Sequence, residues 1–177
     1  EHKKTVTIQP GIIRDELNDY LKPFGLFFSP NTSTSNRCMI GGMVGNNSSG
    51  TTSIKFGVTR DKVLELKTIL SDGSEAIFNK ITISEFDQKK QGNSLENRIY
   101  QTIFNELSNP KNQQEIIKEF PKKNIHRRNN GYAVDELLNY EGFGGKNQTI
   151  NLATLLTGSE GTLAFTTEIT LQLDDLP

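Results

Sequence analysis

Apolar and polar side chains alternate most regularly near the end of the chain. One face of residues 163–173 is apolar and the other is polar, with a period of two residues. This period is typical of a β-strand with one buried face, because successive side chains of a strand point to opposite sides. The pattern therefore predicts a half-buried strand. Its apolar face comprises Leu163, Phe165, Ile169, Leu171 and Leu173, and its polar face comprises Thr166, Glu168, Thr170 and Gln172.

Shorter strands are predicted from similar patterns. Residues 5–8 alternate, and a Pro-Gly pair then breaks the alternation as a turn would. Residues 26–28 are apolar but too few for a helix, so a buried strand is expected there. Residues 63–70 and 75–78 flank a Ser-Asp-Gly-Ser sequence that is typical of a tight turn. These two segments are predicted to form a hairpin.

Two longer segments have the apolar spacing of an amphipathic helix. They are residues 11–21, with Gly25 placed to end the helix, and residues 94–107, with Ser94 as the expected N-cap and Pro110 beyond the end. Residues 111–149 are rich in Lys, Asn, Gln and Gly. Apart from a short helix over residues 114–120, this region is predicted to be an irregular excursion.

The order of these elements indicates the fold class. Strands and helices mix without a regular βαβ alternation, and no internal repeat is visible. The sequence therefore predicts an α+β fold, with a mainly antiparallel sheet and flanking helices. A chain of 177 residues fits one domain or two small lobes, and a hydrophobic content of 33% indicates an adequate but lean core.

Charge and composition argue against several classes of protein. Twenty Lys and Arg residues oppose 21 Asp and Glu residues, so no overall field favours binding to nucleic acid or to an anionic membrane. No apolar run approaches the ~20 residues of a membrane span. The start lacks an initiator Met and a signal-peptide pattern, as expected for a piece of a longer protein. The single cysteine, Cys38, excludes an internal disulfide and is expected to be a small buried hydrophobe.

Several common catalytic and nucleotide-binding motifs fail on inspection. Residues 142–145 lack the third glycine of a GxGxxG motif, no P-loop sequence occurs, and residues 158–161 are not a GxSxG motif. The two histidines, His2 and His126, have no second ligand at metal-binding spacing, so no metal site is predicted. A basic cluster at residues 122–128 is interpreted as a solvated loop.

Two glycine-rich segments are candidate binding loops. Residues 41–50 hold four glycines, which let the backbone approach a flat or anionic ligand. A short helix beginning near Gly41 would point free N–H groups at phosphate oxygens. Residues 158–162 place backbone amides at the entrance of the last predicted strand. Composition alone favours an ordinary loop in the first segment and a plain turn in the second.

Four motifs occur along the chain: PNTST at residues 30–34, MIGGMVGNNSSG at 39–50, KFGVTRDKV at 55–63 and LTGSEGTL at 156–163. Their order changes this balance, because together they resemble the FAD-linked oxidase family. That family includes the flavin-dependent D-lactate, glycolate and D-2-hydroxyglutarate dehydrogenases and shares the fold of vanillyl-alcohol oxidase. The GMVGNNS sequence at residues 42–48, together with the segment at residues 127–132, is most similar to the long members that carry a C-terminal iron-sulphur region.

The resemblance implies that the cofactor is FAD, and it assigns cofactor-binding residues in four groups. Along the flavin and its ribityl chain it places Pro30, Asn31, Thr32 and Ser33. The turn by the pyrophosphate matches Ile40, Gly41 and Gly42. Close to the isoalloxazine and ribityl it places Asn46, Asn47, Ser48, Ser49 and Gly50. The strand entrance at the adenosine half matches Glu160, Gly161, Thr162, Phe165 and Thr166.

Three departures from the family pattern limit what the resemblance implies. The glycine-rich Arg-Gly-x-Gly-Thr loop of a preceding subdomain is absent, and the chain stops before the substrate cap, so no catalytic base is assigned. Ser49 stands where the long members often have Cys, which argues against a thiol role or a covalent flavin link. Residues 1–177 are therefore expected to be the second, larger subdomain of a vanillyl-alcohol oxidase-type FAD-binding domain, inactive alone.

The function implied by the resemblance is oxidation of a 2-hydroxyacid by hydride transfer to FAD. A quinone, cytochrome or iron-sulphur relay would reoxidise the flavin, in a cytoplasmic enzyme or in one held peripherally at the inner membrane. Two alternatives stay open: a sugar-lactone, alditol or aryl-alcohol oxidase of the same fold, and a non-catalytic interaction domain. Apolar surface at residues 26–28 and at Phe165 would favour a homodimer.

Overall fold

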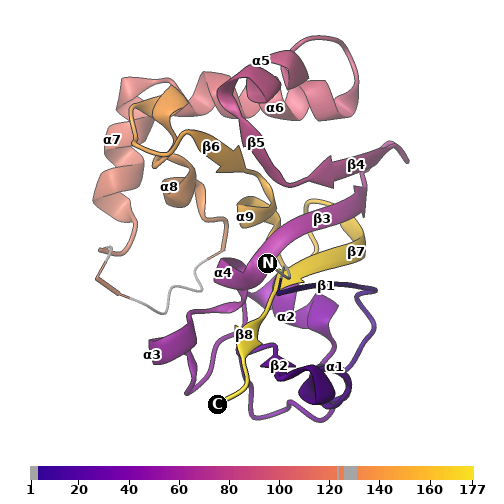
Figure 1. The fold of residues 1–177 in the computed structure, drawn as a ribbon. Coiled ribbons are helices and arrows are strands. Elements are labelled where there is room, and N and C mark those ends of the chain that lie inside the picture. The colour runs from indigo at the N-terminus through magenta and orange to yellow at the C-terminus, as the bar shows by residue number, and fades with distance from the viewer. Residues whose placement is uncertain (1–3, 123, 126–130) are drawn as a thin grey trace.

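A four-stranded antiparallel sheet forms the centre of the protein (Figure 1). The computed structural model describes residues 4–122, 124–125 and 131–177. In spatial order, the strands are β1 (Thr5–Ile8), β7 (Phe165–Gln172), β3 (Val63–Ile69) and β4 (Glu75–Phe78). The predicted strand over residues 5–8 and the predicted hairpin are confirmed, because β3 pairs with β4 across the Ser-Asp-Gly-Ser turn.

The last long strand, β7, is half-buried only along its second half. Ile169 and Leu171 are fully buried, whereas Phe165 is 69% exposed and Leu163, which precedes the strand, is 42% exposed. β1 pairs only with residues 169–172, so the first part of β7 extends past the end of β1. The prediction of one continuous buried face over residues 163–173 is therefore wrong at Leu163 and Phe165.

The N-terminal third packs beside this sheet. Helix α1 (Arg14–Leu21) is followed by a 3₁₀ turn, η1 (Lys22–Phe24), and Gly25 ends it with a φ of 68°. The helix begins three residues later than residue 11 because Ile13 is extended and bridges to Met39. Strand β2 (Leu26–Phe27) pairs with β8 (Asp174–Asp175). Phe27 and Phe28 are buried, so the expected apolar surface at residues 26–28 is absent, whereas that at Phe165 is present.

A second layer contains the two-stranded antiparallel sheet of β5 (Lys80–Thr82) and β6 (Thr149–Asn151) with helices α5 (Ile83–Lys89) and α6 (Leu95–Leu107). Ser94 caps α6 as predicted, because its hydroxyl accepts the Asn97 N–H. Phe86 packs among Tyr100, Tyr140 and Phe143, with ring centroids 5.3–6.1 Å apart. Burial raises the pKa of both tyrosines above the usual value. This aromatic cluster forms the core of the second layer.

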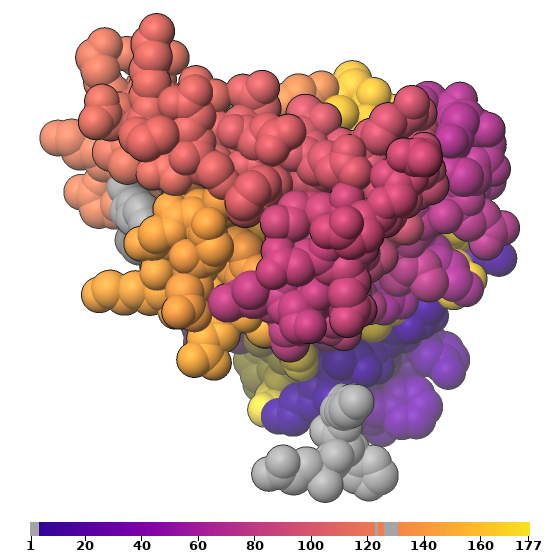
Figure 2. All heavy atoms as spheres, turned by 90° about the horizontal axis from the view of Figure 1, so that it is seen from above, coloured from indigo at the N-terminus to yellow at the C-terminus, as the bar shows by residue number. Residues whose placement is uncertain are grey.

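Residues 111–149, expected to be an excursion with one short helix, contain more regular structure than the pattern indicated. Pro110 lies after α6 as expected, but it starts α7 (Pro110–Glu119) with Asn109 as the N-cap. The region also contains α8 (Val134–Leu137) and the 3₁₀ turn η2 (Glu141–Phe143). Viewed from above, α5, α6 and α7 cover much of the visible face (Figure 2). How residues 1–177 divide into functional subdomains remains a prediction.

Besides α5 and α8, three short helices were not predicted. They are α3 (Ser53–Phe56), α4 (Thr59–Lys62) and α9 (Ala153–Leu156). Each has only four residues, which is too short for an apolar period to appear in the sequence. The mixture of these helices with antiparallel strands confirms the predicted α+β class.

Candidate cofactor-binding site

The first glycine-rich segment folds as helix α2 (Ile40–Asn46) and the loop that follows it. The helix starts against the turn after β1, because the Ile40 and Gly41 N–H groups donate to the carbonyls of Ile12 and Pro10, at 2.9 and 2.8 Å. A Cβ atom at Gly41 would lie 2.6 Å from the Pro10 Cβ. Only glycine therefore permits this close approach.

These contacts change the expected role of the helix N-terminus. Free N–H groups were expected near Gly41, but the Gly41 N–H is already bonded to Pro10. Gly42 differs, because a Cβ atom there would have no heavy atom within 4 Å. The structure thus makes Gly41 a packing glycine and leaves Gly42 as the bare position that faces open space.

The second glycine-rich segment, residues 157–162, lies against the end of α2; we call it the 157–162 turn. The Gly158 and Glu160 N–H groups donate to the carbonyls of Val44 and Gly45, both at 2.9 Å. Glu160 and Gly161 both have positive φ angles, 52° and 72°. The Thr162 hydroxyl donates to the Ser159 carbonyl at 2.6 Å and lies 2.7 Å from the Tyr132 hydroxyl. The two predicted binding loops are therefore one hydrogen-bonded unit.

A cleft of about 450 Å³ opens where these two segments meet. Ligand sites are typically about 300–1,000 Å³ in volume, so this cleft can hold part of a dinucleotide. Neither Gly42 nor Gly161 would place a Cβ atom near another protein atom, which leaves backbone open to a ligand. The residues therefore fit a diphosphate-bearing cofactor. Five of the sequence-predicted residues line this cleft: Gly41, Gly42, Gly161, Phe165 and Thr166.

The loop of residues 30–33 lies beside the end of the first glycine-rich segment. The Asn31 Oδ1 accepts from the Thr52 N–H and hydroxyl, at 3.2 and 2.8 Å. A Cβ atom at Gly50 would collide with the Asn31 carbonyl oxygen, so glycine is needed there. The Arg14 Nε donates to the Pro30 carbonyl at 3.1 Å and fixes the start of the loop. Pro30 is buried, Asn31 and Thr32 are half-buried, and Ser33 is exposed.

The residues after α2 are partly turned away from solvent. Asn47 is fully buried with a φ of 49°, and its Oδ1 accepts the Arg60 N–H at 2.8 Å. Ser48 is also buried, and its hydroxyl accepts from the exposed Asn46 side chain. Asn46, Asn47, Ser48, Ser49 and Gly50 do not line the cleft, and neither do Ile40, Glu160, Thr162 or residues 30–33. Their contacts with the flavin remain a prediction.

The structure adds cleft residues that the sequence did not indicate. Pro10 and Gly11 were interpreted only as a turn, but both line the cleft, together with Met39, Gly45 and Ser159. A Pro-Gly pair after a strand is so common in turns that it carries no ligand signal. Cys38, expected to be buried, is half-buried with its Sγ 3.3 Å from the Thr32 hydroxyl.

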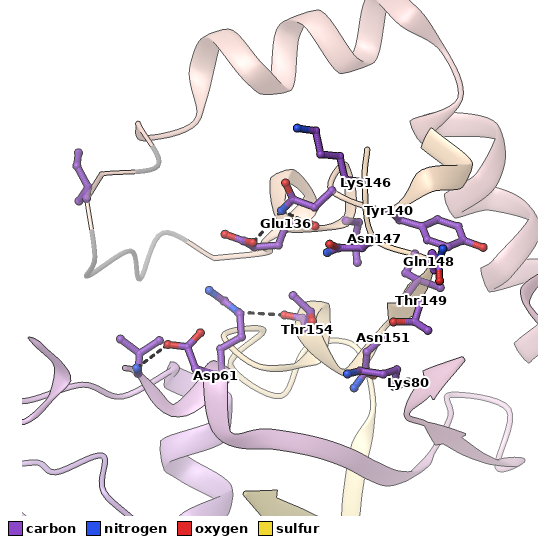
Figure 3. Close-up of a pocket in the computed structure, with 16 residues that line it drawn as sticks. Asp61, Lys80, Glu136, Tyr140, Lys146, Asn147, Gln148, Thr149, Asn151 and Thr154 are labelled. Atoms are coloured by element: carbon purple, nitrogen blue, oxygen red, sulfur yellow. Dashed lines mark hydrogen bonds between the residues drawn. The ribbon is translucent and has the colours of Figure 1, made fainter. Parts of the chain in front are cut away.

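A larger polar cleft, of about 970 Å³, lies elsewhere, and none of the predicted cofactor residues line it. Figure 3 shows Asp61, Lys80, Glu136 and Lys146 around it. The Asp61 carboxylate accepts the Val58 N–H, and Glu136 accepts from the Asn139 side chain, so both acids have partners within the protein. Size alone would select this cleft, but it is the smaller cleft that five of the predicted cofactor residues line.

Among residues 4–122, 124–125 and 131–177, no group of three or more His, Cys, Asp and Glu side chains is placed to hold a metal ion. Among the helices described, none combines the length and apolar character that crossing a membrane requires. His126 and most of the motif at residues 127–132 lie outside the described residues.

Comparison with known proteins agrees with a cofactor-binding role for the first glycine-rich segment. Residues 1–78 match a protein-family model described as an FAD binding domain. Residues 1–78 are therefore similar to FAD binding domains. The matched residues include β1, α2 and the loop at residues 30–33, and the family indicates FAD as the cofactor. The resemblance to FAD-linked oxidases and the expected cofactor are both confirmed.

Curated relatives extend the match over the whole chain. D-2-hydroxyglutarate dehydrogenase of Escherichia coli (strain K12) is 38% identical over 172 residues, which cover 97% of this chain and 16% of that protein. The glycolate oxidase subunit GlcD of Bacillus subtilis (strain 168) is 38% identical over 73 residues, which cover 41% of this chain and 16% of that protein. The chain thus spans about a sixth of the length of the curated relatives it matches.

A solved structure supports the fold. In one crystal form of alkyldihydroxyacetonephosphate synthase, the match covers 99% of this chain and 20% of that one, with a TM-score of 0.53 and 18% sequence identity. At this identity the likeness concerns the fold alone. It agrees with the α+β class and with the fold expected from the family resemblance.

Proposed function

We propose that this chain is the FAD-binding part of a flavin-dependent dehydrogenase that oxidises the CH–OH group of a 2-hydroxyacid. The observation that carries the proposal is the cleft between α2 and the 157–162 turn, where bare backbone at Gly42 and Gly161 adjoins two loops joined by hydrogen bonds. The family match over residues 1–78 supports FAD as the ligand. The relatives named for 2-hydroxyacids support the substrate class.

The chain's own residues would bind and orient the cofactor. Gly42 and Gly161 would let the backbone approach the cofactor, and the exposed Phe165 ring would supply an apolar contact at the same cleft. The Asn31 side chain would hold the loop of residues 30–33 along the ligand. Bound FAD would supply the hydride acceptor. The catalytic base is assigned to none of these residues.

The substrate and partners follow from the same proposal. D-2-hydroxyglutarate, glycolate and D-lactate are the candidate substrates. The acceptor class is a quinone, a cytochrome or an iron-sulphur relay, and the location is cytoplasmic or peripheral at the inner membrane. The acceptor and the location rest on the resemblance to the family, and the candidate substrates rest on the relatives' names.

The experiment uses the intact protein that carries this sequence. Its visible absorption spectrum is expected to show flavin bands, and its Gly42→Leu variant is expected to lose the flavin because the new side chain occupies the cleft. Asn105→Leu adds a similar side chain on an exposed part of α6 and is the matched control. Flavin retained in Gly42→Leu, or a wild-type protein unable to take up FAD, would refute the proposal. Turnover of the three hydroxyacids then identifies the substrate.

A further inference from the structure

We propose that Arg60 is a positioning residue for the cofactor site, fixing the 157–162 turn against the end of α2. This inference rests on the proposed function, because α2 and the turn form the walls of the cleft. Arg60 lies on α4, outside the cleft lining, and nothing in its sequence motif singled it out. Its contacts bring together segments that are about a hundred residues apart in sequence.

The guanidinium group of Arg60 donates to main-chain carbonyl oxygens. Its Nη2 lies 2.6 Å from the Thr157 oxygen and 3.5 Å from the Gly131 oxygen. Its Nε lies 3.2 Å from the Thr154 oxygen and 3.2 Å from the Thr157 oxygen. The bond to Thr154 is drawn in Figure 3. Because Thr154 and Thr157 belong to the backbone of α9 and its C-cap, these contacts determine the path of the chain there.

The same peptide unit is held from both sides. In a trans peptide the C=O and the following N–H point in opposite directions. The Thr157 C=O faces Arg60, and the Gly158 N–H faces the Val44 carbonyl of α2 at 2.9 Å. The Arg60 guanidinium and the end of α2 therefore hold the peptide between Thr157 and Gly158 from opposite sides.

Two further observations tie Arg60 to the two glycine-rich segments. The Arg60 N–H donates to the buried Asn47 Oδ1 at 2.8 Å, so α4 is attached to the residue that ends α2. A Cβ atom at Gly158 would lie 2.5 Å from the Arg60 Nη2, and Gly158 has a φ of 98°. Glycine at this position thus permits both the backbone conformation and the close approach of the guanidinium.

Lysine cannot reproduce these contacts. The donors at Nε and Nη2 lie in one rigid plane and reach Thr154, Thr157 and Gly131 together. An ammonium group is a point charge without this fork. Arg60→Lys therefore keeps the positive charge but loses the planar set of hydrogen bonds. It distinguishes an effect of these hydrogen bonds on FAD affinity from an effect of the charge.

The test compares FAD affinity with stability in the intact protein. FAD is titrated into the apoprotein by flavin fluorescence, and the melting temperature of the apoprotein is recorded separately. Arg60→Gln and Arg60→Lys are both expected to raise the FAD Kd by about tenfold or more, since hydrogen bonds from a charged donor are lost. Arg98→Gln removes an exposed arginine of α6 and is expected to leave the Kd unchanged.

A second control separates positioning from general destabilisation. Phe86→Leu disturbs the aromatic cluster of the second layer, away from the cleft lining, and is expected to lower the melting temperature with little change in Kd. Wild-type affinity in Arg60→Lys would overturn the inference, and so would a Kd increase in Phe86→Leu equal to that in Arg60→Gln. A wild-type protein that does not bind FAD would instead refute the proposed function.

Discussion

Asn47 permits the sharpest prediction from a single buried side chain. It ends α2 in the left-handed region, with a φ of 49°, and its Oδ1 accepts the Arg60 N–H. Ala at this position would lose the acceptor, leaving an N–H donor without its partner at a cost of about 1–3 kcal/mol. The left-handed conformation costs a residue such as Ala roughly 1–2 kcal/mol, a penalty that Asn partly avoids. We therefore expect Asn47→Ala to destabilise this region by about 2–4 kcal/mol.

Two companion substitutions separate the two contributions. Asn47→Gly keeps the backbone conformation but lacks the acceptor, so it should lose less stability than Asn47→Ala. Asn47→Asp keeps an acceptor oxygen but brings a negative charge into a fully buried position, so the desolvation of the carboxylate offsets the retained hydrogen bond. The Gly variant is thus predicted to be more stable than the Ala variant, and the Asp variant reports the cost of burying the charge.

Hydrogen–deuterium exchange of the intact protein measures this effect locally, in peptides that cover residues 44–62. Since 1.4 kcal/mol corresponds to a factor of ten, Asn47→Ala should speed exchange there by roughly thirty- to seven-hundred-fold in the fast-reclosing regime. Peptides of α6 should exchange as in the wild type. Equal exchange rates in the Ala and Gly variants would show that the positive φ at residue 47 does not destabilise the Ala variant. Wild-type exchange in all three would refute the reasoning about the hydrogen bond as well.

Two other regions give independent predictions. Phe86→Ala should destabilise the second layer by about 3–5 kcal/mol, because it opens a cavity among Tyr100, Tyr140 and Phe143; exchange in α5 and α6 measures this, and an unchanged rate would contradict it. Hydrogen bonds from the Thr82 N–H and hydroxyl lower the pKa of Glu85. The stabilisation of α5 by the Glu85 carboxylate is therefore present above the ordinary carboxyl pKa and is lost as the pH falls through the lowered pKa of Glu85. Glu85→Gln should remove this pH dependence from the protection of α5, measured against the wild type at equal pH, and a persistent dependence would assign it to another group.

The sequence predicted the sheet well because its strands carry clear periodic patterns. β1, the β3–β4 hairpin and most of β7 follow from alternation and turn residues. The prediction was wrong at Phe165 because alternation shows which residues share a face, whereas burial depends on whether a neighbouring element covers that face. The start of α1 was misplaced for a related reason, since Ile13 bridges to Met39, a residue far along the chain.

The candidate site was predictable where its chemistry depends on bare backbone. Gly42 and Gly161 were selected from motifs, and they line the same cleft. The roles of Gly41 and Asn47 were not predictable, because they depend on contacts with Pro10 and Arg60 that only the folded chain creates. An arginine that donates to main-chain carbonyls leaves no pattern in a single sequence.

The pairing of β1 with β7 has a consequence for the order of assembly. Val6 pairs with Leu171, so β1 cannot join the sheet until β7 has been synthesised. The cleft has the same dependence, because α2 supplies one wall and the 157–162 turn the other. During synthesis on the ribosome, α2 would emerge long before its partner, and its buried Met43 and Val44 would stay uncovered until then. Cofactor capture at this cleft thus requires that the 157–162 turn has been synthesised, and a ribosome stalled before residue 157 would carry a chain without the second wall.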